Sequence, residues 1–162
     1  MRGRTVVPMM LALATSLVFT RAAISQQVNP PGVVFKFDKR TDGWKLLEDV
    51  SQTLSAAGFN LVPFLGGGDS YIEGDSMAAR AIELGANLGQ HDAEYLLENQ
   101  QLIPTELRSI LLVFPGTKWR DFDDSIRVPC LGWRDDRWAL FFYWIDFGYH
   151  SSTFARLVRP RK

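Results

Sequence analysis

The strongest structural signal in the chain is the stretch RWALFFYWIDF, residues 137–147. Successive side chains of an extended strand point to opposite faces. One face of this strand would carry Trp138, Leu140, Phe142 and Trp144, and the other Ala139, Phe141, Tyr143 and Ile145. Neither face is polar, so the strand is either covered on both sides or exposes a large apolar surface on one. Two hypotheses follow: a two-sided core, or an aromatic platform for a partner or a second copy of the chain.

The residues before this stretch are predicted to pair with it. Residues 127–133 would run antiparallel to it across a turn at 134–136, which places Trp133 opposite Trp138. Residues 154–158 then have the pattern of a last strand before a basic tail.

A second hairpin is predicted earlier in the chain. Its strands would be residues 110–114 and 118–120, because Pro115 followed by Gly116 suits a type II turn between them.

The first half of the chain has helical spacing. Apolar residues recur at three- and four-residue steps from Trp44 to Ala57, and Gly58 stands where a helix would stop. Two further helices are predicted from about residue 76 to Gly85 and from Asp92 to just before Pro104, and together they would form an αα-hairpin. Residues 60–65 are predicted to form a short strand between the first helix and this pair.

These patterns predict an α+β fold. We expect about three short helices packed on one face of a four- to five-stranded antiparallel C-terminal sheet. A single globular domain would span residues 26–162, with its helical part at about 41–104 and its sheet at about 109–159.

The N-terminus has the pattern of a signal peptide, residues 1–25. Arg2 and Arg4 precede an apolar run from Val6 to Phe19, which is too short to span a bilayer comfortably. Small residues before Gln26 predict cleavage there, so the mature chain would be periplasmic or secreted. An uncleaved anchor, or a mispredicted start codon and a cytoplasmic protein, are the alternatives.

Composition narrows the functional classes. Hydrophobic residues make up 46% of the chain and charged residues 22%, a balance typical of a globular protein and not of a disordered one. The formal net charge is zero, so no overall field attracts nucleic acid or an anionic membrane. The single cysteine, Cys130, rules out an internal disulfide and a multi-cysteine zinc site. We expect no cofactor and no metal site.

Three segments resemble a group of small uncharacterised bacterial proteins. They are Leu84–Gln100, Leu112–Arg120 and Arg156–Arg159, and the resemblance would cover roughly residues 36–162. It implies a bacterial source and no particular activity.

The best functional hypothesis is a non-enzymatic binding or interaction domain that uses the aromatic sheet. Tryptophan and tyrosine give a large contact area at low entropic cost. The candidate contact residues are Trp119, Trp133, Trp138, Trp144 and Tyr149. The partner would be another protein or a second copy of this chain.

A small serine hydrolase is the alternative. Two Gly-Asp-Ser triplets contain Ser70 and Ser76, and they are similar to the nucleophile motif of GDSL-type hydrolases. The late pair would be Asp146 and His150, but its Asp-x-x-x-His spacing departs from the Asp-x-x-His of that family. The same triplets are also common in turns and helix caps.

Two other interpretations are less favoured. Basic residues outnumber acidic ones from Lys118 to Lys162, which allows nucleic-acid binding through these strands, whereas the predicted helical pair is acidic and would repel phosphate. The acidic run from Asp121 to Ser125 invites comparison with a calcium loop. It lacks the glycine and glutamate of an EF-hand at the required positions, so a solvated turn is the better interpretation.

Overall fold

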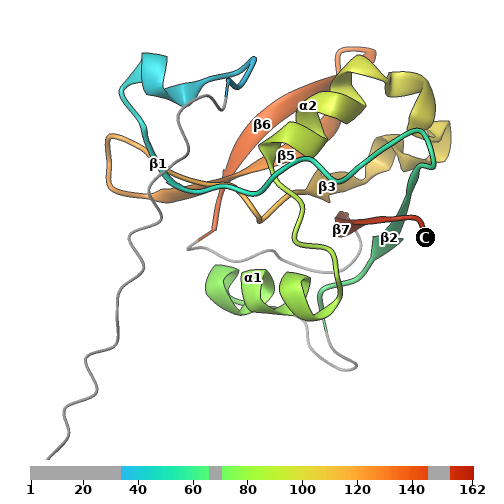
Figure 1. The fold of residues 1–162 in the computed structure, drawn as a ribbon, viewed down its shortest axis with the longest axis horizontal. Helices are drawn as coiled ribbons and strands as arrows, with labels where there is room; N and C mark the ends of the chain where they lie inside the picture. Colours follow the sequence, from blue (N-terminus) through green and yellow to red (C-terminus); the bar gives the residue numbers. More distant parts are fainter. Residues whose placement is uncertain (1–33, 66–70, 146–153) are drawn as a thin grey trace, which may run out of the picture.

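The structure is a computed structural model that describes residues 34–65, 71–145 and 154–162. The predicted signal peptide lies outside these residues, so its cleavage stays a prediction. The described chain has an α+β fold, as predicted, in which two α-helices accompany a curled seven-stranded sheet (Figure 1). It has fewer helices and more strands than expected.

The α-helices are α1 (Gly74–Glu83) and α2 (Gln90–Glu98). Three short 3-10 helices are η1 (Lys39–Asp42), η2 (Gln100–Leu102) and η3 (Thr105–Ser109). The strands are β1 (Lys45–Glu48), β2 (Phe59–Val62), β3 (Leu111–Val113), β4 (Lys118–Arg120), β5 (Ile126–Arg134), β6 (Arg137–Trp144) and β7 (Ala155–Pro160). The sheet order is β1-β4-β5-β3-β7-β2, with β6 paired to β5 outside this order. All pairs are antiparallel except β3 with β7.

Strand β5 has partners along both of its edges. β6 pairs with it along its length in the predicted hairpin, and Trp133 stands opposite Trp138 with ring centroids 5.7 Å apart, as predicted. Along its other edge, β5 pairs with β3 over one part of its length and with β4 over another. Val113 stands opposite Cys130, and Trp119 stands opposite Arg127. The predicted hairpin of β3 with β4 is therefore wrong, because both strands take β5 as their partner.

The residues between β3 and β4, predicted as a hairpin turn, lie against the loop before α2 instead. The amide of Gly116 donates a 2.8 Å hydrogen bond to the carbonyl oxygen of Leu88, just before α2. A Cβ atom on Gly116 would lie 2.6 Å from Cγ2 of Val50 and 2.9 Å from the carbonyl oxygens of Asn87 and Leu88. Glycine is required here because two loops approach each other too closely for a side chain.

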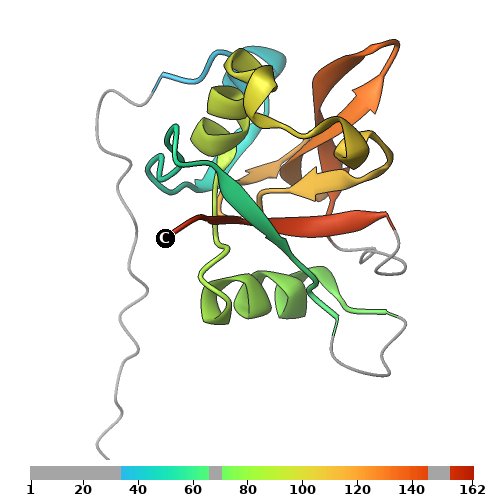
Figure 2. The same cartoon turned by 90° about the vertical axis from the view of Figure 1, so that its right-hand side faces the viewer.

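The two helices lie on opposite faces of the sheet (Figures 1 and 2). Met77 and Ala81 of α1 pack with Val128 and Cys130 of β5 in one buried cluster. Residues of α2 pack with Leu131 and Trp138 in a second cluster. The predicted αα-hairpin and one-sided packing are therefore wrong. A sheet that is apolar on both faces is buried most completely when one helix covers each face.

The stretch from Trp44 to Ala57, predicted as a helix, contains β1 and irregular chain. Leu46 of β1 stands opposite Trp119 of β4. Further along, the amides of Thr53 and Leu54 donate hydrogen bonds of 2.7 and 2.6 Å to Oδ1 of Asp92. Backbone groups that a helix would have paired internally are thus satisfied by distant partners, and tertiary contacts override the local spacing.

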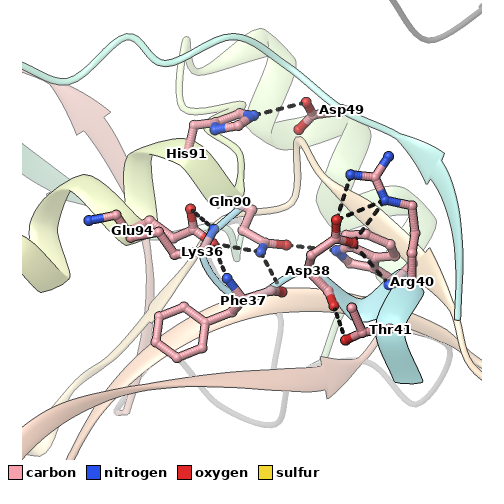
Figure 3. Close-up of polar contacts among 10 residues, drawn as sticks. Lys36, Phe37, Asp38, Arg40, Thr41, Asp49, Gln90, His91 and Glu94 are labelled. Atoms are coloured by element: carbon pink, nitrogen blue, oxygen red, sulfur yellow. Dashed lines mark hydrogen bonds and ion pairs between the residues drawn. The ribbon is translucent and has the colours of Figure 1, made fainter. Parts of the chain in front are cut away.

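The first turn of α2 holds the preceding segments in place through buried polar side chains (Figure 3). The side-chain nitrogen of Gln90 donates to the carbonyl oxygen of Phe37 at 3.0 Å and to Glu94 at 2.8 Å. Glu94 accepts from the amides of Lys36 and Phe37 at 3.1 and 3.0 Å. Buried polar groups of this kind are costly unless paired, so the network fixes the path of the chain before β1.

Candidate functional site

The predicted contact residues differ in how far their side chains are exposed. Trp119 is fully buried and Trp138 is only 4% exposed, so both belong to the core and neither is available to a partner. Trp133 is half-buried, Trp144 is 39% exposed, and Tyr149 lies outside the described residues. Only Trp133 and Trp144 of the described candidates remain possible contact residues.

The two faces of β6 pack against different helices. The side that packs under α2 carries Trp138 and Leu140. Phe141 stands opposite Cys130 and Tyr143 opposite Val128, both buried residues of the α1 cluster, and Ile145 just after β6 is buried in the same cluster. Tyr143 is nevertheless 38% exposed. Most of the sheet has a two-sided core, whereas the outer end of β6 is partly open on both faces.

On the α2 side, this open end carries aromatic rings interleaved with cations. The rings of Trp44 and Phe142 meet edge to face at 5.6 Å, and Lys39 Nζ lies 5.1 and 5.2 Å from their centroids. The guanidinium of Arg127 stacks 3.8 Å from the ring centroid of Trp144. Both cations also pair with carboxylates, Lys39 with Asp42 and Arg127 with Asp121, so this cluster is electrically balanced.

A hollow of about 370 Å³ lies between the segment before β3 and the β5–β6 hairpin. Its walls are mostly aromatic and basic. It is lined by Arg108, Ser109, Ile110, Leu111, Gly132, Trp133, Arg134, Phe141, Phe142, Tyr143 and Phe154. Ligand pockets usually have volumes of about 300–1,000 Å³, so the hollow is large enough for a small ligand or one docked side chain.

Two arginines of the hollow stack on its aromatic walls. The guanidinium carbon of Arg108 lies 3.9 Å from the ring centroid of Trp133, and that of Arg134 lies 4.8 Å from the ring centroid of Phe141. Such cation–π contacts orient the guanidinium groups without using up their hydrogen-bond donors. The hollow therefore presents flat apolar surfaces beside positioned cations.

Sequence reasoning found only part of this site. Trp133 was predicted from the aromatic strands, but Arg108 and Phe154 were not. They come from segments far apart in the sequence, and no local motif marks them. The interleaving of aromatic and basic residues in the C-terminal third was the one signal that pointed to this surface.

The structure does not assemble a hydrolase site from the described residues. Ser76 is exposed in the first turn of α1, whereas Ser70, Asp146 and His150 lie outside the described residues. The described histidine, His91, stacks on Phe35 at 4.5 Å and lies 3.3 Å from the carboxylate of Asp49. That carboxylate also accepts a hydrogen bond from the Thr117 hydroxyl, so His91 is part of the packing around α2.

The acidic segment Asp121–Ser125 forms the turn between β4 and β5. Oδ1 of Asp121 accepts hydrogen bonds of 3.0 Å from the amides of Asp123 and Ser125, and Oδ2 accepts a 2.7 Å bond from Nε of Arg127. Burial alone would raise the pKa of the Asp121 carboxyl, but the bonds from Arg127 and the two amides outweigh it and lower the pKa. This carboxylate stabilises the turn, and its oxygens are already occupied.

No group of three or more histidine, cysteine, aspartate or glutamate side chains in the described parts of the chain is placed to hold a metal ion. No helix among the described residues is both long and apolar enough to cross a membrane.

Comparisons of the chain with models of protein families, with curated proteins and with solved structures gave no match.

Proposed function

We propose that the protein is a small non-enzymatic binding domain whose contact surface is the outer part of the β5–β6 hairpin with the hollow beside it. The observation that carries this proposal is the hollow of about 370 Å³, whose walls bring five aromatic side chains together: Trp133, Phe141, Phe142, Tyr143 and Phe154. Aromatic side chains placed around a concave surface are typical of ligand pockets and of interface anchors.

The exposure of large apolar side chains supports the proposal that this is the contact surface. Phe154 is 40% exposed, close to the values for Tyr143 and Trp144. An exposed leucine or phenylalanine alone needs no explanation, but aromatic residues gathered around one hollow indicate a binding surface. A second copy of the chain is another possible occupant, and sedimentation velocity over a range of protein concentrations would detect it.

The experiment uses the tryptophan indole groups as reporters. A library of small aromatic and aliphatic fragments is titrated into uniformly 15N-labelled protein, and the indole N–H signals are followed by NMR. We expect bound fragments to shift the signal of Trp133, while the signal of the buried Trp119 stays in place. Fragments that shift no indole signal, or that shift those of Trp119 and Trp133 equally, would contradict the proposal.

A matched pair of variants locates the binding. Phe154→Ala removes an exposed ring from the hollow, and Phe122→Ala removes an exposed ring from the β4–β5 turn, where the side chain is 79% exposed. Fragment binding should weaken in the first variant and remain in the second. Equal binding by both variants would place the contact surface elsewhere.

A further inference from the structure

The charges around the hollow narrow the chemical class of its ligand. Three arginines of the described chain form ion pairs with carboxylates: Arg40 with Asp38, Arg80 with Glu83, and Arg127 with Asp121. The other described arginines, Arg108 and Arg134 among them, have no ion pair within 4.0 Å in the described part of the chain, and of these only Arg108 and Arg134 line the hollow. No acidic side chain lines the hollow.

The nearby carboxylates do not line the hollow. Glu106 precedes Arg108 by two residues and accepts a 3.2 Å hydrogen bond from the Thr105 hydroxyl, but it does not line the hollow. Asp135 and Asp136 form the turn after Arg134, both with positive φ, and they do not line the hollow either. The two guanidinium groups therefore give the hollow a local positive charge in a chain whose net charge is zero.

The guanidinium groups also keep donors for an anion. Each lies over an aromatic ring, and a guanidinium that stacks on a ring still directs its N–H groups outward in its own plane. Planar guanidinium groups bind carboxylate, sulfonate and phosphate oxygens with charge-assisted hydrogen bonds. The ring of Phe154, which also lines the hollow and is 40% exposed, offers a surface on which a flat apolar group can stack.

We propose that the hollow binds a planar aromatic anion, with its ring against the aromatic walls and its anionic group held by a lining arginine, Arg134 or Arg108. This inference rests on the proposed function, because it names the ligand class of the same surface. The volume of about 370 Å³ fits two or three aromatic rings with a single anionic substituent.

Two fluorescent dyes with the same aromatic body test the anionic requirement. One is 8-anilinonaphthalene-1-sulfonate, and the other is N-phenyl-1-naphthylamine, which lacks the sulfonate. The sulfonated dye should bind more tightly than the neutral dye, and its affinity should fall as salt is added, because salt screens the arginines. Equal affinity of the two dyes, or affinity independent of salt, would overturn the proposal.

Paired arginine variants locate the anion. The double variant Arg108→Gln/Arg134→Gln should weaken binding of the sulfonated dye by about tenfold or more and leave the neutral dye unchanged. The control Arg80→Gln/Arg159→Gln removes the same charge away from the hollow, which neither residue lines, and should leave both dyes unchanged. Circular dichroism of each variant excludes unfolding as the cause of any change. Unchanged binding of the sulfonated dye to Arg108→Gln/Arg134→Gln would overturn the proposal.

The same dyes separate failure of this proposal from failure of the proposed function. If Phe154→Ala weakens both dyes and the arginine variants weaken neither, the hollow binds aromatic groups and does not select anions. If no variant of the hollow changes either dye, both proposals fail. Competition with 1-naphthoate and with UMP identifies the preferred anion as carboxylate or phosphate. Displacement by either supports the proposal, and displacement by neither at millimolar concentration overturns it.

Discussion

The indole nitrogen of Trp119 donates a 2.7 Å hydrogen bond to the side-chain oxygen of Gln90, and both side chains are fully buried. This bond joins β4 to the first turn of α2. Gln90 also donates to the carbonyl oxygen of Phe37 and to Glu94, so one amide group connects the sheet, the helix and the segment before η1. A buried amide that uses both its donor and its acceptor contributes to specificity as well as to stability.

Replacement of this amide by an apolar side chain of similar length should destabilise the fold. Gln90→Met leaves the Trp119 N–H and the Phe37 carbonyl without their partner, and each unpaired buried group costs about 1–3 kcal/mol. We expect the free energy of unfolding, measured by urea titration, to fall by roughly 2–4 kcal/mol. Gln100→Met is the matched control, because the side chain of Gln100 is exposed and its replacement should change stability by less than about 0.5 kcal/mol. Equal stability of the two variants would mean that the network contributes little.

Two tryptophans of β6 should differ sharply in their effect on stability. Trp138 is 4% exposed and packs in the cluster under α2, so Trp138→Ala should cost about 3–5 kcal/mol, the usual penalty for deleting a core aromatic. Trp144 is 39% exposed at the open end of the strand, so Trp144→Ala should cost only about 1 kcal/mol. Thermal or urea unfolding of both variants measures the difference. Equal, severe losses would mean that the open end of β6 belongs to the core and would remove it from the binding surface.

Export is predicted from the sequence alone, because residues 1–25 lie outside the described residues. Arg2, Arg4 and the apolar run to Phe19 predict removal of residues 1–25 on secretion. The intact mass of protein recovered from the periplasm or culture medium should correspond to a chain that starts at Gln26. Recovery of a full-length cytoplasmic species would show that the segment is not a signal peptide.

The parts of the fold predicted correctly depend on neighbours in the sequence. The β5–β6 hairpin was predictable because its strands lie side by side across a tight turn, so the alternating pattern and the Trp133–Trp138 pair follow from local geometry. The predictions of β2 and of the end of α1 at Gly85, whose φ is +62°, also depended only on neighbouring residues.

The parts that were missed depend on distant partners. The pairing of Leu46 with Trp119 joins segments that no local pattern connects, and the three- and four-residue spacing around β1 resembled a helix. The hollow likewise combines Arg108, Trp133 and Phe154 from three separate segments. Which face of β6 is buried was unpredictable because both faces are apolar, and only the positions of α1 and α2 decide it.

As the pH falls, Asp92 and Asp121 should change the stability of the fold in opposite directions. Burial raises the pKa of Asp92 above its ordinary value of 3.8, despite the hydrogen bonds from Leu54, Thr53 and Gly89 that oppose the shift. The bonds from Arg127 and two amides lower the pKa of Asp121 below the same value, against the effect of its burial. When folding raises the pKa of a carboxyl group, protonation of that group stabilises the folded state. When folding lowers the pKa, ionisation of the group stabilises the folded state.

The sign of each contribution follows from this linkage. As the pH falls from 7 toward the raised pKa of Asp92, the folded state takes up a proton before the unfolded state does, and stability rises. The contribution of Asp121 is complete above its ordinary value of 3.8 and is lost as the pH falls from there through its lowered pKa.

Urea midpoints measured from pH 7 to pH 2 should therefore fall more steeply below about pH 4 in the parent protein than in Asp121→Asn. Asp92→Asn should remove part of the gain at mildly acidic pH, while Asp123→Asn, an exposed change in the same turn as Asp121, should keep the parent profile. A parent profile in Asp121→Asn would show that the bond to Arg127 does not govern acid stability.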